Sequence, residues 1–472
     1  MTGAITIVST DEARRFNADV IVVGSGAGSM AVAGELGRNG KKVLIVEAGP
    51  LLDSPPGRHR RNVLNAEDFL SEAITKLRPH GNSSEARPGL EGAASIHSVG
   101  GMLSYWSYMV PRPDFKWEWD NAISRDEFES YLGRAEDLLW ATTSLFGDGS
   151  PRQRWIIDVI NERFGPDFVR PADLAGRVGA NGEIDFAAGD NLLAGGEAGL
   201  ALLPDTVAVR LHHDGGQLKG LTVRHGPERT ECYLEAPIFV VGGGTLGTPQ
   251  LLHGSGIKLP ALGRYLTDHL NLVSRVLLKS GDAPIDGPDD PPVWLRIPVG
   301  EGRDFQVGIL DIPSTAHAGI LQGADHLRTT DIGCFIGTDP VFDNRLSFDD
   351  ETLDGLGLPS IRAHVELTQS DHDRVTRAFA MQYQLARTIG EPWQGMSPLL
   401  RPFGSSLHLM GTYRAGADPE TSVTDGDCKV WGFENLYLAG NGLLGSLNHC
   451  NPTLTTVAFG LRAADAIVSL AK

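Results

Sequence analysis

Short, wholly apolar runs that end near a glycine recur along the chain. Residues 19–24 and 42–47 contain two such runs, which are rich in valine and isoleucine and follow Asp19 and Lys42. Between them, residues 29–39 carry apolar side chains at helical spacing up to Gly40. Continuous β-branched runs are typical of strands that a parallel sheet buries on both faces. The sequence therefore predicts a strand–helix–strand unit of about thirty residues near the N-terminus.

The same pattern returns in the middle and at the end of the chain. Residues 236–242 form a third apolar run, and a helix is predicted after it, from Thr248 to about His253. Residues 436–440 form a fourth run, and the last predicted helix covers 453–471. We expect these distant segments to join one doubly wound, Rossmann-type layer.

The intervening segments alternate between apolar and polar residues, which is typical of antiparallel strands. The alternation is visible in 204–225 and across 273–395, where Asp, Pro and Gly turns separate the runs. Helical spacing predicts helices over 125–165 and 370–390, whereas the polar stretch 51–95 predicts an extended excursion with short helices. The predicted fold class is α/β: a Rossmann-type domain with a second α+β domain built on a mostly antiparallel sheet.

The predicted domains are discontinuous. A chain of 472 residues is too long for one ordinary core. We assign residues 1–110, 195–272 and 400–472 to a nucleotide-binding domain, and residues 111–194 and 273–399 to a substrate-binding domain.

A glycine-rich turn follows the first predicted strand. Gly24 permits a tight turn, and Gly26 lets a pyrophosphate approach bare backbone at the start of a helix. The usual third glycine would fall at position 29, where this chain has Ser29, and Gly28 stands one residue earlier. Glu47 ends the second strand about twenty residues on, where its carboxylate can accept hydrogen bonds from a ribose diol. The unit predicts a dinucleotide site, but this pattern alone leaves FAD and NAD open.

Charge and cysteine usage exclude several classes of partner. The formal net charge is −18, which repels nucleic acid and anionic membranes, and we expect Arg58–Arg61 to be an ordinary surface turn. No metal site is predicted, since Cys232, Cys334, Cys428 and Cys450 form no metal-ligand spacing and are expected to be reduced, buried thiols. The sequence shows no signal-peptide pattern and no membrane span, so a cytoplasmic enzyme is expected.

Several blocks of sequence, in order and at plausible spacing, resemble the glucose–methanol–choline (GMC) oxidoreductases, and most closely the pyranose oxidases and the bacterial C-glycoside 3-oxidases. The blocks are the N-terminal unit, Val99–Trp106, Gly263–His269, Cys334–Thr338, Asn344–Phe348, Leu407–Gly416, Cys428–Asn441 and Asn451–Thr455. The resemblance covers both ends of the chain well and the middle in patches. It implies that the dinucleotide is FAD.

The motif and the resemblance together predict the residues that contact FAD. They are Gly24, Gly26, Ala27, Gly28, Ser29, Glu47, Ala48, Gly101, Met102, Ser104, Tyr105, Trp106, Val207, Gly243, Asn441, Pro452 and Thr453. In pyranose oxidases the Gly-Gly block carries a histidine that bonds covalently to the flavin, and the matching position here is Tyr105. A tyrosine is not expected to make that bond, so the resemblance implies noncovalent FAD. The alternative role for Tyr105 and Trp106 is simple aromatic packing.

The resemblance also implies a catalytic pair. His408 falls where the family carries its base, in an apolar loop, and a neutral histidine can take a hydroxyl proton near neutral pH. Asn451 falls where the family carries a second polar group, which would hold the same oxygen. The alternative for Asn451 is a helix cap ahead of Pro452, and His449 is its rival in the pair.

The expected function is therefore FAD-dependent oxidation of a secondary hydroxyl of a sugar or glycoside, at carbon 3 or carbon 2, to a keto-sugar. A C-glycoside is among the expected substrates. Reduced FAD would pass its electrons to dioxygen or another acceptor, and self-association into a homo-oligomer is left open. Three alternatives remain: a GMC dehydrogenase of a non-sugar alcohol, a NAD-dependent dehydrogenase, and a flavin-binding protein without catalysis.

Overall fold

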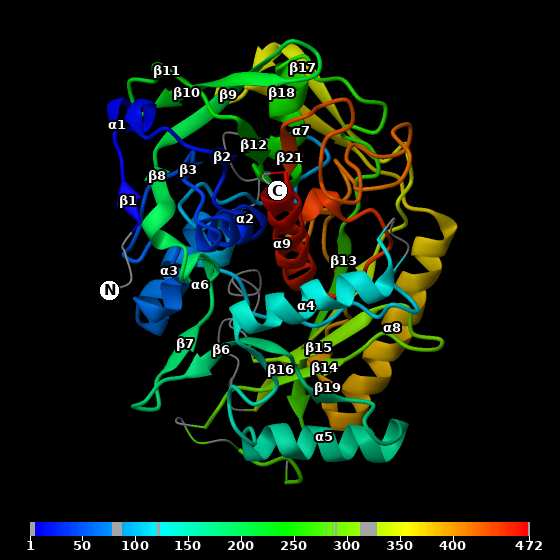
Figure 1. Ribbon diagram of the computed structural model, residues 1–472. Helices are drawn as coiled ribbons and strands as arrows, with labels where there is room; N and C mark the ends of the chain where they lie inside the picture. Colours follow the sequence, from blue (N-terminus) through cyan, green and yellow to red (C-terminus); the bar gives the residue numbers. More distant parts are fainter. Residues whose placement is uncertain are drawn as a thin grey trace.

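A computed structural model describes residues 5–77, 87–119, 123–279, 281–285, 287, 290–311 and 328–470 (Figure 1). The first four residues, on which the expectation about a signal peptide partly rests, lie outside the described residues. So do residue 471 of the predicted last helix and parts of the predicted segments 51–95 and 273–395.

A six-stranded parallel sheet forms the first layer, and its strands come from the start, middle and end of the chain. In spatial order the strands are β1 (Thr6–Ile7), β8 (Leu200–Leu203), β3 (Val43–Val46), β2 (Val20–Val23), β12 (Ile238–Val241) and β21 (Leu436–Leu438). Every neighbouring pair is parallel. All residues of β2 and β3 are buried, as the continuous apolar runs predict.

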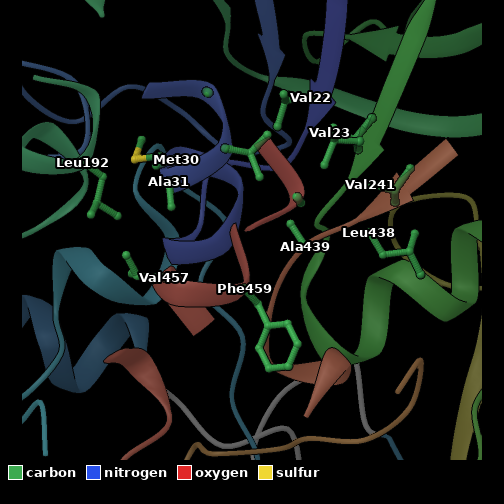
Figure 2. Close-up of a cluster of buried hydrophobic side chains, with 14 of the residues drawn as sticks. Val22, Val23, Met30, Ala31, Leu192, Val241, Leu438, Ala439, Val457 and Phe459 are labelled. Atoms are coloured by element: carbon green, nitrogen blue, oxygen red, sulfur yellow. The ribbon is translucent and has the colours of Figure 1, made fainter. Parts of the chain in front are cut away.

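Helix α2 (Ala27–Arg38) packs against the C-terminal helix α9 (Thr453–Ser469) on one side of this sheet. Figure 2 shows that side chains of α2, α9 and the strand ends share one buried cluster. The contact with helix α6 (Gly189–Leu193) is closer still, because a Cβ on Gly34 would lie 1.9 Å from the carbonyl oxygen of Leu192. The Rossmann-type layer predicted from the sequence is confirmed.

A seven-stranded antiparallel sheet forms the second layer. Its strands are β19 (Gly390–Pro392), β13 (His269–Leu278), β16 (Thr329–Gly337), β15 (Gln306–Leu310), β14 (Trp294–Ile297) and β5 (Arg170–Pro171) in order, with β20 (Leu399–Leu400) also paired to β13. Helices α8 (Gln369–Ile389) and α5 (Pro151–Phe164) share a hydrophobic core with one face of this sheet. The predicted antiparallel second layer is therefore present.

Smaller elements complete the described fold. Three sheets are β9 (Thr206–His213), β10 (Leu218–His225) and β11 (Thr230–Leu234); β17 (Arg345–Leu353) and β18 (Pro359–His364); and β4 (Ala141–Thr142), β6 (Leu174–Val178) and β7 (Ile184–Phe186). The remaining α-helices are α1 (Thr10–Arg15), α3 (Ala66–Lys76), α4 (Arg125–Leu139) and α7 (Gly244–Gly254). All four cysteines are free and buried, as expected.

The helical region predicted over 125–165 is present as two helices, α4 and α5, with a break between them. Trp140 takes a left-handed conformation, with φ 52°, and ends α4. Ser150 then caps α5 through its side chain. Both helices are amphipathic, so the apolar spacing continues across the break and conceals the turn.

Helix α7 begins four residues earlier than the predicted start at Thr248. Pro249 lies inside it and has no N–H to donate to the carbonyl of Thr245. The hydroxyl of Thr412 donates to that carbonyl instead, at 2.6 Å. A hydrogen bond from a distant part of the chain therefore compensates for the proline. The local sequence does not reveal this contact.

The expectation that Arg58–Arg61 is an ordinary surface turn is also wrong. His59 is 0% exposed, and Arg60, 8% exposed, forms an ion pair with Glu72. Arg61 lines the cavity described below. A basic run in the sequence here lies in the interior because acidic partners and aromatic rings surround it.

The domain limits remain a prediction. Two helices assigned to the substrate-binding domain pack against helices assigned to the nucleotide-binding domain. Helix α4 packs against α9, and α6 packs against α2, although both helices lie in 111–194, the segment assigned to the substrate-binding domain. The same segment supplies β5 and α5 to the antiparallel layer. The chain thus crosses between the two layers within this stretch.

The contact at Gly34 predicts a change in stability. Gly34→Ala would drive a Cβ into the Leu192 carbonyl oxygen, so we expect the free energy of unfolding to fall by about 2 kcal/mol. Gly133→Ala, inside α4, is the matched control. Its nearest neighbour is the flexible end of Arg112 at 4.0 Å, so it should raise stability by about 0.5–1 kcal/mol. Urea denaturation measures both, and an equal response would contradict the close packing of α2 on α6.

Candidate active site

A cavity of 590 Å³ is lined by residues of both sheets. On one side it meets the carboxyl ends of the parallel strands, at Val23, Val46 and Gly242. Ligands of doubly wound sheets collect at this edge. The cavity is of a size typical for small-molecule sites.

Alternate residues of the antiparallel sheet form the opposite wall. Asn271 and Val273 of β13 line the cavity, as do Gly333 and Phe335 of β16. Successive residues of a strand point to opposite faces, so the residues between them enter the core under α8. Gly333 pairs with Gly308 of β15, and a Cβ on Gly333 would meet nothing within 4 Å. The wall is therefore hollow beside Phe335.

Close backbone contacts shape the glycine-rich turn. Gly24 has φ 89°, and a Cβ there would lie 2.4 Å from the carbonyl oxygen of Gly242. A Cβ on Gly28 would lie 2.6 Å from the backbone nitrogen of Gly440. Gly28 thus serves the close packing expected of the missing third glycine. Ser29 is accommodated, and its hydroxyl donates to the carbonyl of Gly242 at 3.3 Å.

The start of α2 fits a dinucleotide. Gly26 lines the cavity, and a Cβ there would meet nothing within 4 Å, so bare backbone borders open space at a helix N-terminus. Glu47 lies beside it and accepts from the Ser25 N–H at 3.0 Å, the Ser25 hydroxyl at 2.6 Å and the Gly49 N–H at 2.8 Å. Burial raises the pKa of Glu47 to about 7, although these donors favour the charged form.

The Gly-Gly block is tied to this turn. The Gly100 N–H donates to the Ser25 hydroxyl at 3.0 Å, and a Cβ on Gly101 would lie 3.4 Å from the Cα of Gly26. Serine 25 therefore links the block, the turn and Glu47 in one buried network. This network places the block over the predicted pyrophosphate position.

Tyr105 and Trp106 both line the cavity and are held by hydrogen bonds. The Tyr105 hydroxyl donates to Glu72, and the Trp106 indole N–H donates to the carbonyl of Ala187 at 3.0 Å. All the predicted FAD contacts except Ser104 line the cavity. Ser104 is 1% exposed and donates to the carbonyl of Val99 at 3.2 Å, so its part is to hold the block together.

The loop that carries His408 is held by one buried carboxylate. Asp268 accepts from the Gly404 N–H at 2.8 Å, the Ser406 hydroxyl and the His408 N–H at 3.2 Å. Between them, Leu407 is left-handed, with φ 64°, which is a strained conformation for a residue with a side chain. Burial raises the pKa of Asp268 to about 7. The three hydrogen bonds offset the strain at the residue before His408.

The ring of His408 is oriented by a second histidine. The Nδ1 atoms of His408 and His269 are 2.8 Å apart, and Nε2 of His269 is 3.0 Å from the backbone oxygen of Asn448. On its other side, Nε2 of His408 lies 3.5 Å from Nδ2 of Asn451. Burial, together with the nearby His269, lowers the pKa of His408 well below its usual value. The ring is therefore neutral at neutral pH.

Asn451 is fixed from behind by the antiparallel sheet. Gln306 of β15 donates to its Oδ1 at 2.9 Å, which leaves the amide N–H groups directed to His408 and the cavity. Helix α9 begins at Thr453 with Pro452 as its N-cap residue, and no side-chain hydrogen bond caps this end, since Oδ1 of Asn451 accepts from Gln306 instead. The helix-capping alternative for Asn451 is therefore wrong.

His449, the rival considered for the pair, lies outside the cavity lining. It is 1% exposed, its ring Nδ1 accepts from the Gly337 N–H at 2.9 Å, and its backbone N–H donates to Glu118 at 2.6 Å. The structure thus brings His408 and Asn451 together and leaves His449 behind them.

Sequence reasoning missed the residues that support the pair. His269 and Asp268 belong to the Gly263–His269 block, whose resemblance to the family was the available signal for their importance. Gln306 gave no signal, because its role depends on the strand pairing that brings β15 beside the cavity.

Comparison with known proteins agrees with this geometry. Family models described as GMC oxidoreductase match residues 340–460 and 189–271, and one described as FAD binding domain matches residues 19–55. A C-glycoside 3-oxidase from Microbacterium trichothecenolyticum is 29% identical over 504 aligned residues, which cover 94% of this chain and 95% of that protein. A pyranose 2-oxidase from Tricholoma matsutake is 26% identical over an alignment that covers 83% of this chain and 76% of that protein. The structure of Aspergillus oryzae formate oxidase superposes with a TM-score of 0.72 at 15% identity over 99% of both chains, which shows a shared fold.

In sequence the chain is similar to the GMC oxidoreductases over both of these family models and along nearly its whole length to a C-glycoside 3-oxidase. The cofactor of this chain is FAD, and it is an FAD-dependent oxidoreductase of CH–OH donors. In the described part of the chain no helix is long and apolar enough to cross a membrane. Location in the cytoplasm stays a prediction.

The hydrogen bonds of Glu47 predict how a substitution at this residue would change the affinity for FAD. Glu47→Gln keeps the shape of the side chain but replaces an acceptor oxygen with a donor, which opposes the N–H and O–H groups of Ser25 or Gly49. We expect the Kd for FAD to rise by about tenfold, as loss of a charge-assisted hydrogen bond suggests. Fluorescence quenching on titrating the apoprotein measures it. Glu35→Gln is the control, since Glu35 pairs with Arg38 and Arg134 and does not line the cavity, and a matching rise there would refute a specific role for Glu47.

Proposed function

We propose that this protein oxidises a secondary hydroxyl of a sugar or glycoside, at carbon 3 or carbon 2, to a keto-sugar. C-glycosides are among the substrates proposed. The names of its relatives, C-glycoside 3-oxidase and pyranose 2-oxidase, support this substrate class. The observation that carries the proposal is the facing pair of His408 and Asn451 in a cavity that also holds the dinucleotide turn.

His408 acts as the base. Its neutral Nε2 faces the cavity and takes the proton of the substrate hydroxyl, so that the O–H bond breaks and an N–H bond forms. FAD, when bound, would accept the hydride that leaves the carbon bearing this hydroxyl. The reaction therefore turns a CH–OH group into a carbonyl, with the proton on His408 and two electrons on the flavin.

Asn451 stabilises the oxygen from which the proton leaves. Its amide N–H groups are directed to the same space as Nε2 of His408, because Gln306 occupies its Oδ1. A donor fixed before the reaction stabilises the developing alkoxide without reorganisation. Asn451 and His408 would thus contact one substrate oxygen from two sides.

The sheet wall suits a sugar ring. The Phe335 ring centroid is 5.5 Å from that of His408, and Phe335 lines the cavity. The hollow at Gly333 lies beside Phe335 on the same strand face. The aromatic ring offers an apolar surface for the C–H face of a pyranose. Gly333 leaves room for the ring itself.

We propose that FAD is held without a covalent bond. Tyr105 stands at the position matched to the linking histidine of pyranose oxidases, and its hydroxyl is engaged with Glu72. Burial and the Glu72 carboxylate raise the pKa of this phenol, so it is not a nucleophile at neutral pH. Dioxygen or another acceptor would reoxidise the flavin, and self-association stays an open prediction.

Acid precipitation tests the linkage. Trichloroacetic acid should leave a colourless protein pellet and a yellow supernatant, because nothing covalent holds the flavin after unfolding. A pellet that keeps the flavin absorbance after washing would refute the noncovalent proposal.

Anaerobic reduction of the bound flavin tests the function. Mixing with a panel of C- and O-glycosides should bleach the flavin absorbance, and the product should carry a new carbonyl at carbon 3 or carbon 2. His408→Ala should slow bleaching by about 10²- to 10⁴-fold, the usual contribution of a general base. His212→Ala is the matched control and should bleach normally, because His212 bonds to Thr222 on β10, away from the cavity.

Two other outcomes would overturn the proposal. Bleaching by aliphatic alcohols but by none of the sugars or glycosides would identify a dehydrogenase of a non-sugar alcohol. Failure of all these donors to bleach a properly bound flavin would favour a flavin-binding protein without this catalysis.

A further inference from the structure

Behind His408 lie two hydrogen-bonding groups that do not line the cavity, the ring of His269 and the backbone carbonyl of Asn448. The backbone oxygen of Asn448 is 3.0 Å from Nε2 of His269, and Nδ1 of His269 is 2.8 Å from Nδ1 of His408. His269 is 1% exposed and does not line the cavity. It contacts the proposed base only from the rear.

The direction of these hydrogen bonds is fixed by the Asn448 carbonyl. A backbone carbonyl can only accept, so Nε2 of His269 carries a hydrogen and donates to Asn448. In a neutral imidazole the other nitrogen is then an acceptor. Nδ1 of His269 must accept, and the group opposite it, Nδ1 of His408, must donate. In neutral His408 this leaves Nε2 without a hydrogen.

We propose that His269 is a positioning residue that holds His408 in the Nδ1–H tautomer, with a bare Nε2 lone pair facing the substrate. This inference rests on the proposed role of His408 as the base. The opposite tautomer would present an N–H to the substrate and could not take its proton. The tautomer of a catalytic histidine is commonly set by the partner of its other nitrogen.

The surroundings of His269 support a neutral ring. Burial lowers the pKa of His269 to about 4, so it does not carry both hydrogens at neutral pH. If it were protonated, it would donate to Nδ1 of His408 and force the hydrogen of that ring onto Nε2. Asp268 accepts from backbone and hydroxyl groups of the His408 loop rather than from either ring. The acceptor for His408 is therefore His269 alone among these neighbours.

These hydrogen bonds also serve the next stage of the reaction. When Nε2 of His408 takes the substrate proton, the ring becomes an imidazolium with hydrogens on both nitrogens. Nδ1 of His269 continues to accept from Nδ1–H of His408, so the ring needs no rotation. The same hydrogen bond orients the base before proton transfer and partly stabilises its charge afterwards.

Two amide substitutions distinguish the roles of the two ring nitrogens of His269. His269→Asn places an amide oxygen near the position of Nδ1 and keeps an acceptor for His408. His269→Gln reaches the position of Nε2, where it keeps a donor for Asn448, but leaves His408 without its acceptor. We expect H269N to retain most of the anaerobic flavin-reduction rate with a glycoside. We expect H269Q to lose on the order of 10²-fold or more, with little change in substrate Kd, as when a catalytic histidine loses the partner that sets its tautomer.

The tautomer itself is measured by long-range ¹H–¹⁵N NMR of protein labelled with ¹⁵N-histidine. The chain has 14 histidines, and the His408 signal is the one that disappears in His408→Ala. In the wild-type protein it should have a protonated Nδ1 and a bare Nε2. The pattern should persist in H269N and be lost in H269Q.

Each outcome either supports or overturns the proposal. Equal losses in H269N and H269Q, with the His408 tautomer unchanged, would show that His269 only supports the fold. Normal rates in both would equally overturn it. If neither variant binds FAD or melts cooperatively, the wild-type spectrum decides, and Nε2–H at His408 refutes the inference. A different failure, normal flavin reduction by His408→Ala, would refute the proposed base, while the tautomer measurement would still judge the role of His269.

Discussion

At Gly28 three distant parts of the chain come into backbone contact. A Cβ on Gly28 would lie 2.6 Å from the nitrogen of Gly440, and a Cβ on Gly460 would lie 2.7 Å from the oxygen of Gly28. The N-terminal turn, the end of β21 and helix α9 therefore meet without side chains between them. Because α9 begins two residues after Asn451, this contact sets Asn451 at the edge of the cavity that the dinucleotide turn opens. The FAD-binding half and the chemical half of the site depend on one close approach.

The polar groups around the cavity are buried, and hydrogen bonds to their partners fix how each side chain is oriented. Glu47 accepts from Ser25 and Gly49, while Asp268 accepts from the His408 loop. Burial lowers the pKa of His408 and raises the pKa of both carboxyl groups. The interior thus favours neutral forms, which a base that must begin uncharged requires. Backbone groups, which cannot titrate, are among the partners that orient these side chains: the Gly49 N–H for Glu47, the Gly404 N–H for Asp268 and the Asn448 carbonyl for His269.

Much of this fold could be predicted from the sequence, because its strongest elements are local. The uniformly apolar strands 20–23 and 43–46 and the glycine turn between strand and helix carry their own pattern. Elements that depend on distant contacts could not be predicted so well. Helix α7 extends through Pro249 because Thr412 replaces a missing hydrogen bond. The buried Arg60 depends on a carboxylate partner that sequence order does not reveal.

The residues of the candidate site also differ in how well the sequence predicts them. His408 and Asn451 could be located only because flanking blocks resemble a family, and their facing geometry then emerged from the fold. His269 and Gln306, which orient them, lie on strands of the other layer. Their roles follow from strand register and from which ring nitrogen faces a backbone carbonyl. Neither property can be predicted from the spacing of residues along the chain.

The central claim is that His408 is a neutral base whose pKa is depressed by burial. Its active form is the unprotonated ring, which predominates above the pKa and is lost as the pH falls through it. The measurement is the rate of anaerobic flavin reduction by a saturating glycoside, followed from mildly acidic to mildly alkaline pH. A rate that stays level across neutral pH and declines only well below the ordinary histidine pKa of about 6.5 is predicted. A rate that rises as the pH falls, or that has its midpoint near that ordinary value, would contradict the account.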